Sequence, residues 1–317
     1  MSDPGHPTAA PTAPPIATTT SASAEAGPVA EAQIYEQGYR SYDGRRTGVV
    51  GALKTLITHS VRAVLGIGRA ARHKVMPFAV ILLAFTPTVV FVGVAALLPG
   101  DLEEGFLPTY AEYYGFISAV LVLFAALVAP ELLCTDRRTG MLGVYLASPL
   151  DRRSYLLGKT LAISSILAIV TIGPPLLLLI ALSLEDAGPD TWSEGIRLGL
   201  RIIASGAVMS AFYAGVSMAV SATTDRKAAA SATILGLLIG SAAVTNGLVE
   251  GGNLDRRLLL GDLLTLPSEL AFRIHGEEGE WATRDIPTPL IWLTLLAIVA
   301  ICAAWIWDRY RRMLVRR

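Results

Sequence analysis

The sequence has little charge for its length. Only 16% of its 317 residues are charged and 53% are hydrophobic, whereas an ordinary soluble domain has about 25% charged residues. This imbalance excludes a disordered chain and an ordinary water-soluble protein. The formal net charge is +0, so the molecule as a whole has no field that would attract nucleic acid.

The sequence also lacks the motifs of metal sites and common enzymes. Its cysteines, Cys134 and Cys302, have no CxxC or Cys/His spacing, so we predict that both are small buried hydrophobes. No HExxH or GxSxG motif is present. Gly158-Lys159 resembles the end of a phosphate-binding loop, but Arg153 occupies the position of its first glycine. We therefore predict no catalytic, cofactor-binding or metal-binding residues, and no enzymatic activity in this chain.

The N-terminal part of the chain has two segments of different character. Residues 1–33 are mostly Pro, Ala, Thr, Ser and Gly without aromatics, which predicts a disordered tail that is not a signal peptide. Within 34–75, apolar residues recur every three to four positions and basic residues lie largely away from them. This pattern predicts an amphipathic helix in the headgroup plane, or alternatively a helix packed in the cytosol. The apolar positions are Val49, Val50, Leu53, Leu56, Ile57, Val61, Val64, Leu65 and Ile67.

Six apolar runs approach the roughly 20 residues that a helix needs to cross a bilayer. Aspartate, lysine and arginine are missing from the middle of every run, where each would cost about 2.5–3.5 kcal/mol. We therefore predict an all-α membrane protein with a six-span domain over 76–307, followed by a basic tail over 308–317. The predicted spans are 76–98, 114–133, 160–184, 198–222, 228–249 and 289–307.

Basic residues are concentrated in alternate connections between these runs. Twenty of the 26 lysine and arginine residues fall on one side, and six fall on the other side together with sixteen acidic residues. Because lysine and arginine are retained on the cytoplasmic side, we predict a multi-pass protein of the cell membrane with both termini in the cytoplasm.

The basic loop between the second and third predicted spans carries the most informative motif. Asp136-Arg137-Arg138 is followed by Gly140, then by Ser148-Pro149, then by Arg152-Arg153, and finally by a Leu-Gly-Lys sequence that opens an apolar span. Because Pro149 fixes a turn, the loop predicts a short cytosolic helix. A solvated loop that only anchors the topology is the alternative.

The order of these elements resembles the permease subunits of ABC-2 type transporters over about residues 45–315. One departure is that Gly143 and Val144 stand where the family commonly has a glutamate. The resemblance implies an exporter subunit that forms the substrate path, pairs with a second permease subunit as a homodimer or heterodimer, and is driven by a separate cytosolic ABC ATPase that binds the ATP. It also implies ATPase coupling at Asp136, Arg137, Arg138, Gly140, Ser148, Pro149, Arg152 and Arg153.

Other functions are less consistent with the sequence. An ion-coupled secondary transporter would need ionisable groups or broken helices near mid-membrane, and the middles of the spans lack ionisable residues. The sequence lacks the motifs expected of a membrane enzyme. A non-transporting scaffold is a further alternative.

The polar, proline and glycine residues within the spans have two interpretations, which are helix packing and lining of a substrate path. Proline interrupts helical hydrogen bonds, and a GxxxG pair allows close approach of another helix. The positions are Thr86, Thr88, Pro174, Ser210, Tyr213, Gly236 and Gly240. Between the last two spans, the leucine-rich stretch 250–285 predicts short helices on or in the outer leaflet, or a plain amphipathic cap.

Overall fold

The computed structural model describes residues 44, 48–68, 70–97, 107–147, 149–185, 187–279, 281 and 286–315. The predicted tail over 1–33 and Ser148 lie outside these residues. Within them the secondary structure is helical, without strands. The α-helices are α1 Gly48–Val64, α2 Arg72–Leu97, α4 Tyr113–Arg138, α5 Met141–Ala147, α6 Arg152–Leu184, α7 Trp192–Ser221, α8 Lys227–Asn246, α9 Leu266–His275 and α10 Thr288–Val315.

Across the described part of the chain, six helices are long and apolar enough to cross a membrane, which confirms the predicted fold class. They are Lys74–Leu97, Tyr113–Arg138, Arg152–Leu184, Trp192–Ser221, Lys227–Gly251 and Thr288–Arg312. Several of these helices are longer than the predicted runs. Helix α6, for example, begins eight residues before the predicted run 160–184. There Asp151 caps the helix by accepting a hydrogen bond from the Ser154 N–H at 2.8 Å, so polar turns continue the helix beyond its apolar part.

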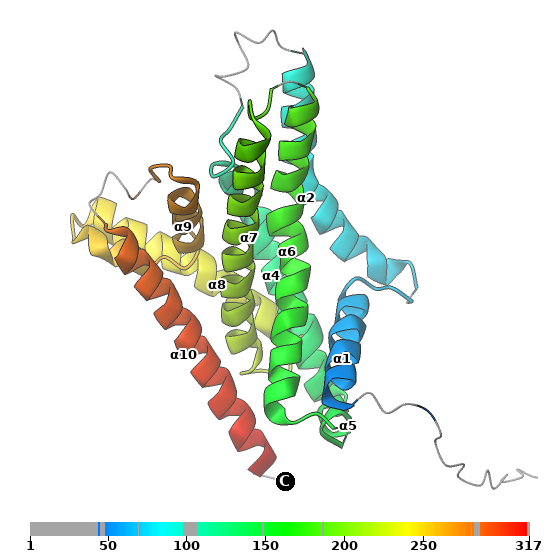
Figure 1. Ribbon diagram of the computed structural model, residues 1–317. Helices are drawn as coiled ribbons and strands as arrows, with labels where there is room; N and C mark the ends of the chain where they lie inside the picture. Colours follow the sequence, from blue (N-terminus) through cyan, green and yellow to red (C-terminus); the bar gives the residue numbers. More distant parts are fainter. Residues whose placement is uncertain are drawn as a thin grey trace, which may run out of the picture. The chain divides into compact units, whose positions relative to one another are not determined.

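Helices α4 and α7 are the most buried spans, whereas α2, α8 and α10 leave most of their surface exposed. Helices α6 and α7 run side by side, and α10 runs obliquely to them with its C-terminal end near the start of α6 (Figure 1). The close approach of α6 and α7 depends on Gly206, because a Cβ there would lie 2.9 Å from the Thr171 carbonyl oxygen. Thr171 Oγ1 also donates a hydrogen bond to the Gly206 carbonyl at 2.9 Å.

Helix α1 packs against the start of α6 and against α4. Its buried side includes Leu56, Ser60 and Val64, while Val50 at its start is 79% exposed. A Cβ at Gly158 would lie 2.7 Å from Leu56 Cδ2, so the missing side chain lets α1 sit directly on α6.

The connection between α8 and α10 contains a π-helical turn Gly247–Gly251, a 3₁₀ helix Arg256–Gly261 and α9. The buried Asp262 carboxylate accepts hydrogen bonds from the backbone N–H groups of Leu264 and Thr265. Glu269 forms an ion pair with Arg273 at 3.2 Å and accepts from the Trp281 N–H. These bonds fix the predicted short helices of this region in place.

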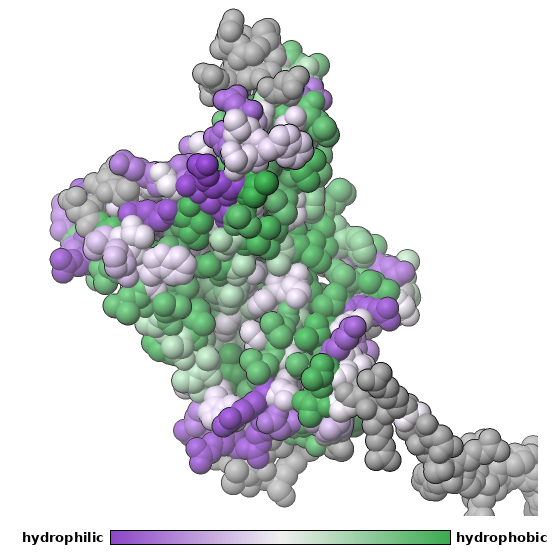
Figure 2. All heavy atoms as spheres, in the orientation of Figure 1, coloured by the Kyte–Doolittle hydropathy of each residue, from purple (hydrophilic) through white to green (hydrophobic). Residues whose placement is uncertain are grey.

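Hydrophobic and hydrophilic residues are distributed over the surface as expected of a protein embedded in lipid. Hydrophobic residues cover the middle of the face shown in Figure 2, and hydrophilic residues gather mainly above and below them. Large apolar side chains such as Leu82, Ile180 and Ile301 are more than half exposed. An exposed apolar band of this size is stable only in contact with lipid or a partner.

Candidate functional site

The loop between α4 and α6 lies at the end of the helices where lysine and arginine residues are concentrated. We call this end the basic end. Helix α4 ends at Thr139, and Gly140 adopts the left-handed conformation with φ +71°, which reverses the chain without steric cost. The seven-residue helix α5 follows. Asp151 accepts hydrogen bonds from the Ser154 N–H and hydroxyl, and these bonds lower the pKa of the Asp151 carboxyl. The loop is therefore a short ordered helix with defined ends.

A buried ion pair lies directly beneath α5. Lys159 Nζ is 2.7 Å from Asp136 Oδ2, and the two side chains are 1% and 11% exposed. The Tyr155 hydroxyl donates to the same carboxylate oxygen at 3.0 Å, and Lys159 donates to Ser60 Oγ at 3.1 Å. Because a buried charge is stable only when it is paired and hydrogen-bonded, these contacts hold the ends of α1, α4 and α6 together.

Two more tyrosines extend this group to α5 and α10. Lys159 Nζ lies 5.4 Å from the ring centroid of Tyr145 in α5, within range for a cation–π contact. Burial and the nearby Asp136 charge raise the pKa of Tyr145. The Tyr155 ring lies 6.0 Å from that of Tyr310 in α10. We call these six residues, Ser60, Asp136, Tyr145, Tyr155, Lys159 and Tyr310, the Asp136 cluster.

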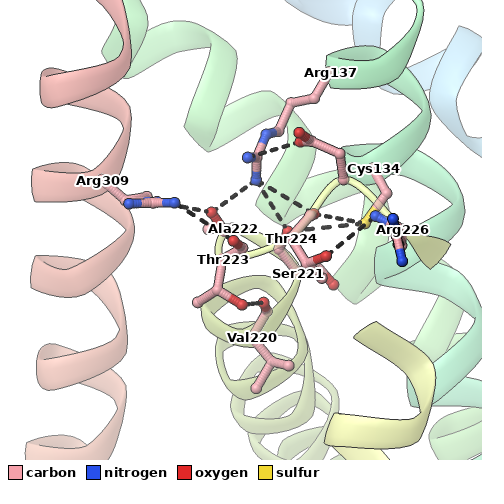
Figure 3. A network of polar contacts seen from close by, with 10 residues as sticks. Cys134, Arg137, Val220, Ser221, Ala222, Thr223, Thr224, Arg226 and Arg309 are labelled. Carbon is pink, nitrogen blue, oxygen red and sulfur yellow. Dashed lines mark hydrogen bonds and ion pairs between the residues drawn. The ribbon is translucent and has the colours of Figure 1, made fainter. Parts of the chain in front are cut away.

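Arg137 forms a second network beside this cluster (Figure 3). Its Nη1 donates to the Ala222 carbonyl at 2.7 Å and to the Ser221 carbonyl at 3.3 Å, and its Nη2 forms an ion pair with Asp225 at 2.7 Å. Arg309 of α10 donates to the Ala222 carbonyl at 3.4 Å. A helix C-terminus presents unpaired carbonyls and partial negative charge, so both arginines bind the end of α7.

The predicted coupling residues therefore fall into two groups. Asp136 and Arg137 make the internal contacts just described. Arg138, Gly140, Pro149 and Arg153 are exposed, and Arg152 is half-buried. The second group faces outward and is accessible to another protein, whereas the first holds the loop on the helices.

Several predicted polar residues of the spans connect helices. Tyr113 Oη lies 2.7 Å from Thr88 Oγ1, which donates to the Pro174 carbonyl at 3.2 Å. The Tyr213 hydroxyl donates to the Leu264 carbonyl at 2.7 Å. The structure thus ties α2 to α4 and α6, and α7 to the segment before α9.

The other predicted positions in the spans make no contacts of this kind to the described residues. Thr86 and Ser210 donate within their own helices, to Leu82 and Ala207. A Cβ at Gly236 or Gly240 would meet nothing within 4 Å in the described part of the chain, so both glycines face away from it.

Sequence reasoning missed the role of Lys159, which we considered as part of a phosphate-binding motif and of the Leu-Gly-Lys element but not as the partner of Asp136. A lysine early in an apolar span, with an aspartate at the end of the preceding span, was the available signal. Ser60 and Tyr145 carried no comparable signal. Among the described residues no group of three His, Cys, Asp or Glu side chains could hold a metal ion.

A family model described as ABC-2 family transporter protein matches residues 16–255. The chain belongs to this family. The match includes α1, α5 and the spans up to α8, and hence the whole Asp136 cluster except Tyr310. No curated protein matches the chain. Together with the six membrane-length helices, the family match identifies a multi-pass membrane protein that is the transport component of an ABC-2 system.

Proposed function

We propose that this protein is the membrane subunit of an exporter and that a separate cytosolic ATPase drives it by docking on α5. The observation that carries the proposal is the position of α5 at the basic end, between two long spans. Helix α5 contributes Tyr145 to the Asp136 cluster, and this ring lies 5.4 Å from Lys159 Nζ. The cluster also joins α1, α4, α6 and α10. A displacement of α5 would therefore be transmitted through this cluster to several spans at once.

The proposed docking surface is a groove between α1 and α5 with a volume of about 740 Å³. Its lining is mainly apolar, and Met141 and Val144 of α5 are 37% and 61% exposed. Arg138 is exposed at the end of the preceding helix. This combination suits a partner surface with an apolar side chain in its centre and acidic residues around it.

Cross-linking tests this proposal. A photo-cross-linking residue at position 144 of the full chain should capture an ATP-hydrolysing chain in the cells that produce the protein. The same residue at Val89, which is 67% exposed on a membrane span, is the matched control and should capture lipid or permease only. The purified subunit alone should not hydrolyse ATP. ATP hydrolysis by the pure subunit, or equal capture at both positions, would overturn the proposal.

The proposed orientation places the basic end in the cytoplasm. It follows from the asymmetry of twenty basic residues against six. In a chain whose Cys134 and Cys302 are replaced by alanine, new cysteines at Arg138 and Arg312 should be labelled only from the cytoplasm. A cysteine at Glu278 should be labelled from outside. Labelling of position 138 in intact cells by an impermeant reagent would reverse the orientation.

We also propose that two permease chains pair through α8. Gly236 and Gly240 lie about one helical turn apart, on a surface where an added Cβ would meet none of the described residues within 4 Å. Glycines at this spacing allow two membrane helices to approach closely.

A further inference from the structure

An apolar groove is lined by residues of α6, α7 and α10. Its volume is about 540 Å³, within the 300–1,000 Å³ typical of small-molecule sites. The lining includes Arg153 and Thr160 of α6, Gly215 and Met218 of α7, and Ala303 and Trp307 of α10.

Small residues give this groove its depth. A Cβ at Gly215 would meet nothing within 4 Å, so the glycine leaves open space between α7 and α10. Ala303 contributes little bulk from the facing helix. Thr160 Oγ1 donates to the Leu156 carbonyl at 2.9 Å and lies 3.3 Å from Met218 Sδ, an alternative acceptor, so its hydroxyl already has a partner. The interior therefore favours an apolar occupant.

One end of the groove is charged and aromatic. The Arg153 guanidinium carbon lies 5.7 Å from the Trp307 ring centroid, a cation–π contact that bridges α6 and α10. Tryptophan beside basic residues is typical of the membrane–water interface. From Trp307 to Val299, the groove follows α10 for eight residues, or about 12 Å, against about 15 Å for one leaflet of hydrocarbon.

The positive charge of Arg153 is available to a ligand. The hydrogen bonds that lower the pKa of the neighbouring Asp151 carboxyl come from Ser154, and the Arg153 charge only helps to lower it. Asp308, next to Trp307, forms an ion pair with Arg312 at 2.9 Å. In the part of the chain that the structure describes, neither carboxylate forms an ion pair with Arg153.

We propose that this groove binds one anionic phospholipid of the leaflet at the basic end, with its phosphate on Arg153 and an acyl chain along Gly215 and Ala303. Charge complementarity selects the headgroup, and the length of the groove matches a chain that descends from the interface. Arginine suits a phosphate because its guanidinium donates two parallel hydrogen bonds.

Native mass spectrometry of the full chain, released from nanodiscs of equal phosphatidylglycerol and phosphatidylcholine, tests the site. The wild type should retain phosphatidylglycerol about fivefold better than phosphatidylcholine, the effect expected of one basic residue at an anionic surface. Arg153→Ala should abolish this preference. Arg312→Ala removes a charge at the same end outside the groove and should leave the preference unchanged.

A second pair of variants tests the apolar part of the groove. Gly215→Phe should fill it and reduce retention of both lipids, and Ala303→Phe should do the same from the exposed face of α10, where it does not disturb the core. Gly93→Phe, in open space on α2, is the control for bulk. Equal retention of the two lipids by the wild type, a preference that survives Arg153→Ala, or retention unchanged in both groove variants would overturn the proposal. No ATPase is present in the assay, so its outcome is independent of the docking proposal.

Discussion

The Lys159 ammonium lies 2.7 Å from the Asp136 carboxylate, and the Lys159 side chain is 1% exposed. The contact joins the last turn of α4 to the second turn of α6. Gly158, the residue before this lysine, admits α1 close enough for Ser60 to accept a hydrogen bond from the same ammonium. The Leu-Gly-Lys sequence in the second turn of α6 thus brings three helices together at one point.

Replacement of Lys159 by methionine should destabilise the protein strongly. The Asp136 carboxylate would remain buried without its cation, and removal of one partner of a buried pair costs about 3–5 kcal/mol. Thermal unfolding in detergent should show a lower Tm. The double variant Asp136→Leu/Lys159→Met removes both charges and should unfold at a higher temperature than either single variant. If Lys159→Met has the same Tm as the wild type, the ion pair does not hold these helices together.

The two adjacent arginines should respond differently to charge reversal. Arg137→Glu would lose the hydrogen bonds to the end of α7 and the ion pair with Asp225, at a cost of about 1.5–3 kcal/mol for a bond to a charged group. Arg138→Glu, at an exposed position, should leave the Tm unchanged and weaken ATPase co-purification with a marked salt dependence. A similar decrease of Tm in both variants would show that Arg137 and Arg138 do not differ in their contribution to stability.

Gly206→Leu should separate α6 from α7. A Cβ at position 206 would lie 2.5 Å from Ile172 Cγ1 and 2.9 Å from the Thr171 carbonyl oxygen, and overpacking of this kind costs about 1–3 kcal/mol. The expected result is a lower Tm and reduced amounts in the membrane. Gly115→Leu, where a side chain would meet nothing within 4 Å, is the matched control. Equal stability of the two variants would contradict the role assigned to Gly206.

If two chains pair through α8 as proposed, Gly236→Ile/Gly240→Ile should convert the dimer into monomers while the chain stays folded. Both new side chains would point into open space in the single chain, so only the close approach of a second helix is blocked. Light scattering of the detergent-solubilised protein measures the change in mass. Gly93→Ile adds similar bulk on α2 and should leave the mass unchanged, whereas an unaltered dimer in the α8 variant would place the interface elsewhere.

The fold could be predicted from the sequence to a large extent because lipid imposes strict limits on composition and length. Apolar runs located all six spans, but most of their ends, including the start of α6, were placed too far inward. The first turns of α6 contain Arg152, Arg153 and Ser154, which are helical because Asp151 caps them and not because they are apolar. A criterion based on hydropathy does not detect such turns.

The candidate site could be predicted only in outline. The motif located the loop and α5, but it did not distinguish Arg137 from Arg138. Besides its ion pair with Asp225, Arg137 donates to backbone carbonyls at the end of α7, and backbone groups have no signature in side-chain patterns. The contacts of Lys159 with Ser60 and Tyr145 depend on how three helices pack, which periodicity within each helix does not specify.

The hydrogen bond from Thr88 to the Pro174 carbonyl also offers α6 a centre of rotation. Lys159 lies fifteen residues from Pro174 along α6, about 22 Å, and Leu184 lies ten residues away on the other side, about 15 Å. If the two arms of α6 keep their angle at Pro174 and turn together about this point, the far end moves in the opposite direction and about two-thirds as far. An inward displacement at the basic end would then be accompanied by an outward displacement at the opposite end.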